Sequence, residues 1–410
     1  MFMRSVALAA VIIGFAAAPA FAAAVTYAGT RGDQNIILEL TEPEDGPVLG
    51  RYTQLSDGAD VPLHFVALGK DGFELAEEKR CTPQICVVPE DGDYSAAPLG
   101  AHWILHYAAD RSTLTGFWHA EPPGAAVVAV TLKRVGQRVY DREDGFSYDY
   151  FLWNDYDGAP ITPETTPYDY AKMQVALTEG PLQTMNGATY RDVVDPRTKF
   201  TFPRVVSLPG GGDIAPVNTM LDQQRWATSF VGLQCLGQDY LSGGWDTRRV
   251  GNGYSPLGDV DQEGISVDYI SDTVMSISQG GSLYCGGASP HNHIDYYTYD
   301  VRAGGALDLS RILKDWDAAS NDPTQALADW VIAAYPKTSD YDADYAAECE
   351  INENIAKHLD ISFASDDTAV FLIGGIDQAA CMGAIVTMPL AQIRDLLTDT
   401  ASDYFPSLNA

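Results

Sequence analysis

The segment from Ser289 to Asp295 contains the side chains of this sequence that could act together in chemistry. It reads Ser-Pro-His-Asn-His-Ile-Asp, so that His291, His293 and Asp295 follow one another at a spacing of two residues. Residues two apart on a β-strand face the same side, and these three would therefore share a face. Two histidines can begin a metal site, with Asp295 as the third ligand. The alternative is a polar strand edge beside a turn, and we predict a ligand-binding position here rather than a metal site.

Hydrolysis by an activated serine is the second chemistry to consider. Ser289, His291 and Asp295 are the residue types of a catalytic triad, but a triad is defined by geometry, and one strand with its turn is too crowded to provide it. The sequence has no Gly-x-Ser-x-Gly motif and no phosphate-binding glycine loop between a strand and a helix. Carboxylate pairs suited to glycoside cleavage are inevitable among 56 acidic residues. We therefore predict no catalytic residue.

Two acidic segments resemble parts of calcium-binding loops. Asp259 to Gly264 matches the first half of such a loop, but Ile270 stands where the closing glutamate should be. The segment 154–158 is similar and equally incomplete. We expect solvated turns at both places and no cofactor, with weak Ca²⁺ binding as the alternative.

Residues 1–22 have the pattern of a secretory signal peptide. Arg4 supplies the positive charge, Val6 to Ala18 forms a short apolar core, and Ala20-Phe21-Ala22 is a small-residue cleavage site. An apolar run of about 13 residues is too short to cross a bilayer. We expect a periplasmic or secreted protein with no membrane span in the mature chain.

The composition is strongly acidic and yet that of a folded protein. The sequence has 56 Asp and Glu against 25 Lys and Arg, a net charge of −31, and 46% hydrophobic residues. Such a charge disfavours nucleic acid and anionic membranes as partners. It favours cations or basic proteins, although solubility alone would also explain it.

The six cysteines are an even number in a chain predicted to be exported, which indicates disulfides. Cys81 and Cys86 are close enough to pair locally. For the other four we predict the pairs Cys235–Cys285 and Cys349–Cys381, because each would join neighbouring elements of one domain. A metal site at Cys81 and Cys86 would lack a second ligand pair.

The first part of the chain, residues 25–135, has the pattern of a small all-β domain. Asn35 to Glu42 alternates apolar and polar residues, as a half-buried strand does. Strands at Gly50–Leu55 and Pro62–Gly69 follow, with the turn signal Asp57-Gly58 between them. Short strands with regular turns predict an antiparallel meander that closes as a barrel or packs as a sandwich.

Residues 136–164 read as a connector rich in Asp, Tyr and Pro. Its aromatic residues could pack against a neighbouring domain. In the alternative, Trp153 and the nearby tyrosines stack on sugar rings.

Residues 165–410 predict an α+β domain with an antiparallel sheet and packed helices. Strands are expected at 173–179 and 198–208, a helix capped by Asp213 follows, and two β segments span 265–285. Further helices are expected from Asp322 and after Pro389. Three closing strands are expected at 361–363, 369–373 and 383–388. Because strands and helices are grouped and do not alternate strictly, α+β is favoured over a doubly wound sheet.

A series of short motifs runs through this second domain. It comprises a strand, a Gly-Gly-Ala turn, an aromatic strand and a Gly-Gly turn before a helix start: Val274–Ile277, Gly286–Ala288, Tyr297, Tyr299-Asp300, Gly304-Gly305, Leu307 and Leu309. From about residue 168 to 410 this order resembles the extracellular domain of the lysozyme-sensing anti-sigma factor RsiV, a domain also found ahead of some peptidoglycan deacetylase domains. Ser289 stands where that family has a histidine, so the role of that histidine does not carry over.

The resemblance and the acidic charge together predict an exported, non-catalytic binding protein of the cell envelope. Its ligand would be cell-wall glycan or a basic wall-directed protein such as lysozyme. The predicted ligand-binding residues are Ser289, His291, His293, Asp295 and Trp153. The alternatives are a hydrolase acting on wall polymers or esters at a cleft between the domains, and a structural envelope protein.

Overall fold

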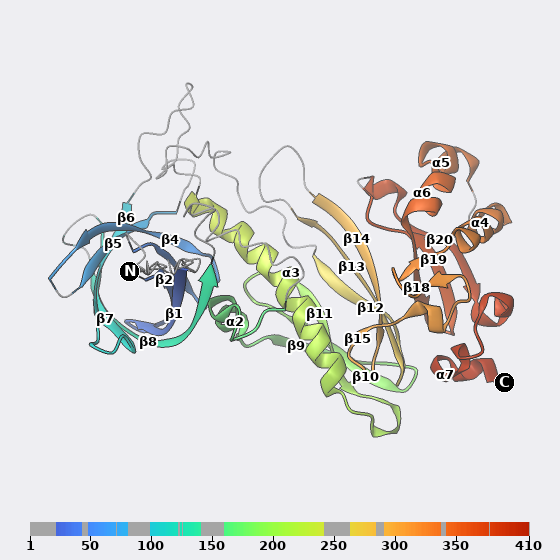
Figure 1. Ribbon diagram of the computed structural model, residues 1–410, viewed down its shortest axis with the longest axis horizontal. Coiled ribbons are helices and arrows are strands. Elements are labelled where there is room, and N and C mark those ends of the chain that lie inside the picture. Colours follow the sequence, from blue (N-terminus) through green and yellow to red (C-terminus); the bar gives the residue numbers. More distant parts are fainter. Residues whose placement is uncertain are drawn as a thin grey trace, which may run out of the picture.

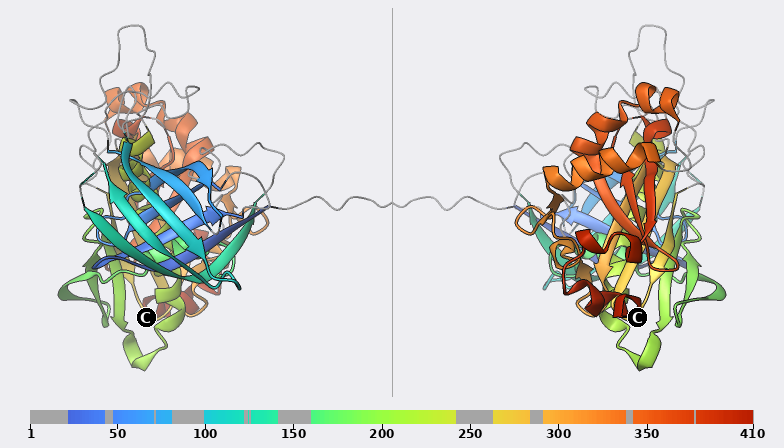
Figure 2. Two further views of the ribbon diagram at one scale, coloured as in Figure 1. Left: turned by 90° about the vertical axis from the view of Figure 1, so that its left-hand side faces the viewer. Right: turned by 90° about the vertical axis from the view of Figure 1, so that its right-hand side faces the viewer.

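The structure is a computed structural model, and it describes residues 22–42, 48–70, 72–80, 99–121, 124, 126–140, 160–241, 263–283, 291–337, 342–376 and 378–409. A β-barrel lies at one end of an elongated molecule, a central sheet with a long helix lies in the middle, and a smaller sheet with helices lies at the other end (Figures 1 and 2). The predicted fold class, a small antiparallel β domain followed by an α+β domain, is confirmed.

The barrel consists of eight antiparallel strands in chain order, and it is closed because the last strand pairs with the first. The strands are β1 (Ala22–Arg31), β2 (Gln34–Thr41), β3 (Gly50–Gln54), β4 (Val61–Leu68), β5 (Phe73–Glu78), β6 (Leu99–Tyr107), β7 (Thr113–Ala120) and β8 (Val127–Tyr140). Alternate residues point inwards and form one apolar core that includes Leu38, Leu75 and Trp103. Of the two architectures left open above, the barrel is the observed one.

The predicted hairpin between β3 and β4 is present, and it contacts the rest of the molecule. Gly58 has a φ of 78°, which a residue with a side chain rarely adopts. A Cβ at this position would lie 2.6 Å from Leu233 Cδ2. Glycine therefore allows the turn to approach the long helix closely.

Two helices connect the barrel to the central sheet. The short helix α2 (Pro167–Met173) begins at its proline and lies against β1, β2 and β8. The long helix α3 (Ala215–Leu241) is the one predicted after Asp213. The strand predicted at 173–179 is wrong over residues 173–177, because Met173 ends the helix that Pro167 starts and residues 174–177 form an irregular connection. Strand β9 begins at Thr178.

The central sheet has seven strands in the order β15-β14-β13-β12-β11-β10-β9. They are β9 (Thr178–Met185), β10 (Ala188–Val194), β11 (Thr201–Ser207), β12 (Gly264–Ile270), β13 (Val274–Leu283), β14 (His291–Asp300) and β15 (Gly305–Ala306). Helix α3 covers one face, where Val217 and Leu221 pack with Met275 and Ile277. The C-terminal unit covers the other face (Figure 1).

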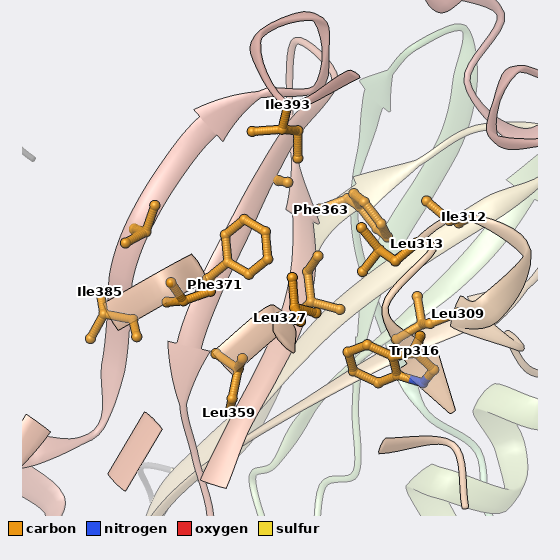
Figure 3. Close-up of a cluster of buried hydrophobic side chains, with 14 of the residues drawn as sticks. Leu309, Ile312, Leu313, Trp316, Leu327, Leu359, Phe363, Phe371, Ile385 and Ile393 are labelled. Carbon is orange, nitrogen blue, oxygen red and sulfur yellow. The ribbon is translucent and has the colours of Figure 1, made fainter. Parts of the chain in front are cut away.

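The C-terminal unit contains the three predicted closing strands, β18 (Leu359–Ala364), β19 (Thr368–Ile373) and β20 (Gly383–Pro389). Helices α4 (Gln325–Ala334), α5 (Ala343–Glu348) and α6 (Ile351–His358) pack on them, and α7 (Ala401–Tyr404) lies near the end of the chain. A single apolar core joins the strands and helices, with Phe363, Phe371 and Leu327 at its centre (Figure 3).

Two predicted helix positions in this unit need correction. Asp322-Pro323 forms the short strand β17, paired with β16 (Trp316–Asp317), and α4 starts later, with Thr324 at its N-cap. The residues after Pro389 form two 3-10 turns, not an α-helix. A helix this short is marginal without packing, and Leu397 instead bridges to Leu313 in an extended pairing.

Candidate functional site

A cleft of about 440 Å³ opens between β14, β17 and the start of β18. Three carboxylates line it, Asp295 from β14, Asp322 from β17 and Asp360 from β18. They come from strands that are far apart in the sequence but meet at one edge of the central sheet. The cleft also has an aromatic wall, to which Tyr296, Tyr297, Tyr299 and Trp316 contribute.

The aromatic wall is ordered by packing. The rings of Tyr297 and Tyr299 lie parallel, with centroids 6.1 Å apart and 12° between the planes. Trp316 lies beside Leu309 (Figure 3), and its Nε1 donates a 3.0 Å hydrogen bond to Asn321 Oδ1. Burial raises the pKa of both tyrosines, so their hydroxyls stay protonated at neutral pH. Tyr299 and Trp316 are buried, so the partly exposed rings of Tyr296 and Tyr297 are the ones on which a cation or a sugar could stack.

The environment of the cleft changes the acidity of Asp360. Burial, together with the nearby charges of Asp295 and Asp322, raises the pKa of Asp360 to about 6 against the opposing hydrogen bond from the backbone N–H of Ile361. Asp360 is therefore ionised at neutral pH but gains a proton in mild acid. A cation entering the cleft would relieve the repulsion among the three carboxylates.

His293 holds Asp295 in place at the edge of the cleft. Its Nδ1 lies 2.7 Å from Asp295 Oδ2, and its Nε2 lies 2.9 Å from Glu263 Oε2. These two hydrogen bonds, the Asp295 bond first, raise the pKa of His293 to about 10. The ring is thus an imidazolium at neutral pH and donates from both nitrogens. A protonated ring of this kind has no lone pair to offer a metal ion.

Glu263 is fixed in turn by the long helix. Gln279 Nε2 donates to Glu263 Oε1 at 3.1 Å, and Gln224 Nε2 on α3 donates to Gln279 Oε1 at 2.6 Å. A chain of hydrogen bonds therefore runs from α3 across the sheet to the cleft. The sequence predicted a solvated turn around Glu263, with weak Ca²⁺ binding as the alternative, whereas the Glu263 side chain is buried as a partner of His293.

Of the five residues predicted to bind a ligand, the structure places two together, His293 and Asp295. His291 opens β14, but its side chain is outside the described residues, as are Ser289 and Trp153. Asp322, Asp360 and Trp316 were missed. Each belongs to a different element, and no spacing in the sequence relates them to β14.

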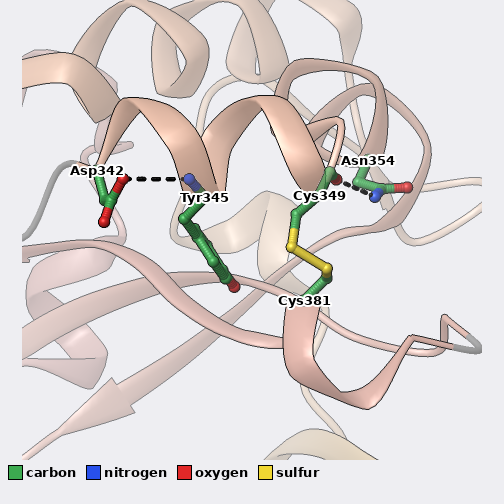
Figure 4. The surroundings of a disulfide bond; sticks show 5 residues. All are labelled: Asp342, Tyr345, Cys349, Asn354 and Cys381. Atoms are coloured by element: carbon green, nitrogen blue, oxygen red, sulfur yellow. Dashed lines mark hydrogen bonds between the residues drawn. A yellow bond between two sulfur atoms is a disulfide. The ribbon is translucent and has the colours of Figure 1, made fainter.

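The predicted disulfide Cys349–Cys381 is confirmed, with 5.4 Å between the two Cα atoms (Figure 4). It joins the end of α5 to the turn before β20. Cys235 is also disulfide-bonded, and its partner lies outside the described residues. Cys81, Cys86 and Cys285 lie there as well, so the pairs Cys81–Cys86 and Cys235–Cys285 stay predictions.

Asp268 on β12 gives a prediction about pH and stability. Burial raises its pKa from 3.8 to about 6, against the opposing hydrogen bond from Ser278. The folded protein therefore binds more protons than the unfolded chain between these two values, and the contribution of Asp268 to stability is lost as pH rises through about 6. We expect Asp268→Asn to raise the denaturation midpoint at about pH 7.5 and to leave it nearly unchanged at about pH 4.

Urea denaturation followed by circular dichroism at both pH values would measure this effect. Asp33→Asn, at an exposed turn of the barrel, is the matched control. Equal shifts at the two pH values would contradict the explanation.

The described residues contain neither a cluster of metal ligands nor a membrane-spanning helix. No group of three or more His, Cys, Asp or Glu side chains is arranged to hold a metal ion in the part of the chain that the structure describes. None of the described helices is long and apolar enough to span a membrane.

No model of a known protein family matches this chain, and no curated protein matches it. Among solved structures, it is similar to a crystal structure of a member of the DUF3298 family from Bacteroides fragilis. That match has 13% sequence identity and a TM-score of 0.33, and it covers 55% of this chain and 93% of the other. A likeness of this degree does not establish membership of that family.

Proposed function

We propose that this chain is an exported binding protein of the cell envelope, and that its cleft receives cationic side chains of a basic partner such as lysozyme. The observation that carries the proposal is that Asp295, Asp322 and Asp360 line one cleft together with the partly exposed rings of Tyr296 and Tyr297. A lysine or arginine side chain can form charge-assisted hydrogen bonds with carboxylates while it stacks on an aromatic face.

The overall charge supports the same partner. With a net charge of −31, the surface would attract a cationic protein from a distance and speed its encounter with the cleft. The resemblance to the RsiV extracellular domain also favours a partner of the cell wall. Its motif residues Val274–Ile277, Tyr297 and Tyr299 lie in β13 and β14, the strands that lead to the cleft.

A binding experiment with hen egg-white lysozyme tests the proposal. We expect the mature protein, with its disulfides intact, to bind lysozyme in calorimetry and to bind more weakly as salt rises from about 0.05 to about 0.5 M. Asp322→Asn and Asp360→Asn should each weaken binding by about three- to tenfold, because each removes one carboxylate from the cleft. Asp33→Asn removes the same charge from an exposed barrel turn and should leave binding unchanged.

The protonation of Asp360 adds a pH dependence. Since its pKa is about 6, binding of a cationic partner should weaken as pH falls through this value. The Asp360→Asn variant should lose that part of the dependence. No binding to lysozyme at low salt would contradict the proposal, and salt-insensitive binding to purified peptidoglycan would point to glycan as the ligand.

A hydrolase acting on wall polymers is the second candidate, and one observation favours it. Asp360, with a pKa of about 6, could serve as a general acid near neutral pH beside the carboxylates of Asp295 and Asp322. Release of soluble fragments from peptidoglycan by the wild-type protein, and its loss in Asp360→Asn, would support this function over the binding one.

A further inference from the structure

A second cleft, of about 480 Å³, is formed by the end of α2, the segment leading to β9, strands β9, β10 and β11, and the middle of α3. One wall is apolar and consists of Met173, Val175, Leu177 and Val193. The other wall carries two arginines, Arg204 and Arg225, and the indole of Trp226.

Two buried N–H donors of the residues that line this cleft have no hydrogen-bond acceptor among the described residues. The Arg225 side chain is only 7% exposed, and within the described ranges its Nη1 has no hydrogen-bond partner. Trp226 Nε1, also buried, has none either. A buried N–H group without an acceptor is costly, and native proteins nearly always satisfy such groups. Both residues line the cleft, so a ligand that reaches these buried groups from the cleft could supply the missing acceptor.

The two arginines of the cleft have few close counterions. Arg204 and Arg225 share a single carboxylate, that of Asp222, at distances of 3.2 to 3.4 Å. Glu179, which also lines the cleft, is paired with Arg191. The two arginines therefore have one carboxylate, that of Asp222, within hydrogen-bonding distance, and the charge of Asp195 adds a further attraction on Arg225.

Arg51 has more close counterions than Arg225 has. Arg51 is surrounded by three carboxylates, which raise its pKa well above the usual value in spite of burial. At Arg225 burial outweighs the attraction of Asp222, and the pKa is lowered. A bound anion would give Arg225 the compensation that Arg51 already has.

We propose that this cleft binds an organic carboxylate with an apolar body, the carboxylate lying between Arg225, Arg204 and Trp226. The apolar body lies along Met173, Val175 and Leu177. Guanidinium and carboxylate groups match in charge and in planar geometry. The apolar wall adds about 25 cal/mol for each Å² of non-polar surface that it removes from water. This site is independent of the acidic cleft, and neither proposal depends on the other.

Calorimetry with octanoate as the probe tests the proposal on the full mature chain. Octanoate should bind, whereas acetate, which lacks the apolar body, and octanol, which lacks the charge, should each bind at least about tenfold more weakly. Equal binding of acetate, or no detectable binding of octanoate at millimolar concentration, would overturn it.

Three variants locate the site. Arg225→Gln should weaken octanoate binding at least about tenfold, and the more exposed Arg204→Gln about threefold. Arg302→Gln, which removes an exposed arginine elsewhere, should leave it unchanged. If Arg225→Gln does not fold, Arg225→Lys retains the charge but not the fork geometry, and it should still weaken binding. Undiminished octanoate binding by the folded Arg204→Gln and Arg225→Lys proteins would rule out the site.

Discussion

Replacing Arg51 by methionine is expected to lower the free energy of unfolding by about 3–5 kcal/mol, because it leaves buried carboxylates without their counterion. The Arg51 side chain is 1% exposed. It lies 3.0 Å from Glu39, 3.1 Å from Asp60 and 3.2 Å from Asp169. Its guanidinium also lies 4.1 Å from the centre of the Tyr168 ring.

The effect should be large because Arg51 joins two parts of the molecule. Glu39 and Asp60 belong to the barrel, and Asp169 belongs to α2. Two further cations complete the cluster, Arg138 at 2.7 Å from Glu39 and Lys172 at 2.8 Å from Asp60. Three positive and three negative side chains therefore balance at the interface between the barrel and α2. Removing one cation leaves an uncompensated negative charge there.

Denaturant unfolding monitored by circular dichroism would measure the loss. Arg302→Ala is the control, since Arg302 forms an exposed ion pair with Asp272 and such a pair contributes at most about 1 kcal/mol. A loss in Arg51→Met no greater than that of the control would mean that the interface is hydrated or that its carboxylates are protonated.

Removing the disulfide Cys349–Cys381 is expected to lower the free energy of unfolding by about 4 kcal/mol. The two cysteines are 32 residues apart, and the loop-closure estimate for such a loop gives about this value. The bond is also well placed to affect the acidic cleft. Helix α6 begins two residues after Cys349 and leads directly to Leu359 and Asp360.

The double variant Cys349→Ser/Cys381→Ser would be compared with the oxidised wild-type protein. Since Cys349 and Cys381 are buried in an apolar core, serine adds the cost of burying hydroxyl groups. The double alanine variant is the control for that cost. If both variants lose stability by similar amounts, the cross-link is responsible; a loss confined to the serine variant would refute the prediction.

The alternation of apolar and polar residues was sufficient to predict most strands. It gave the meander of the barrel, the β segments after residue 265 and the three closing strands, because each strand has one face in a core. The helix after Asp213 followed from its cap and its apolar spacing. Cys349 and Cys381 could be paired because they belong to neighbouring elements of one small unit.

The same alternation misled where a strand is covered on both faces. Asn35 to Glu42 reads as half-buried, yet Ile37, Glu39 and Thr41 are buried as fully as Leu38. Helix α2 packs on the outer face of the barrel at this point, and the sequence pattern of β2 does not predict that contact. The charged cluster around Arg51 could not be predicted from the sequence, because it forms only where α2 packs on the barrel.

The two clefts were decided by tertiary structure alone. Asp295, Asp322 and Asp360 lie on three strands, and Arg204 and Arg225 lie on a strand and a helix. Sequence spacing relates residues within one element, because the periods of 2.0 and 3.6 residues act only along that element. Which elements meet depends on the packing of whole faces, and it was this packing that brought His293 to Glu263 and left Arg225 beside an apolar wall.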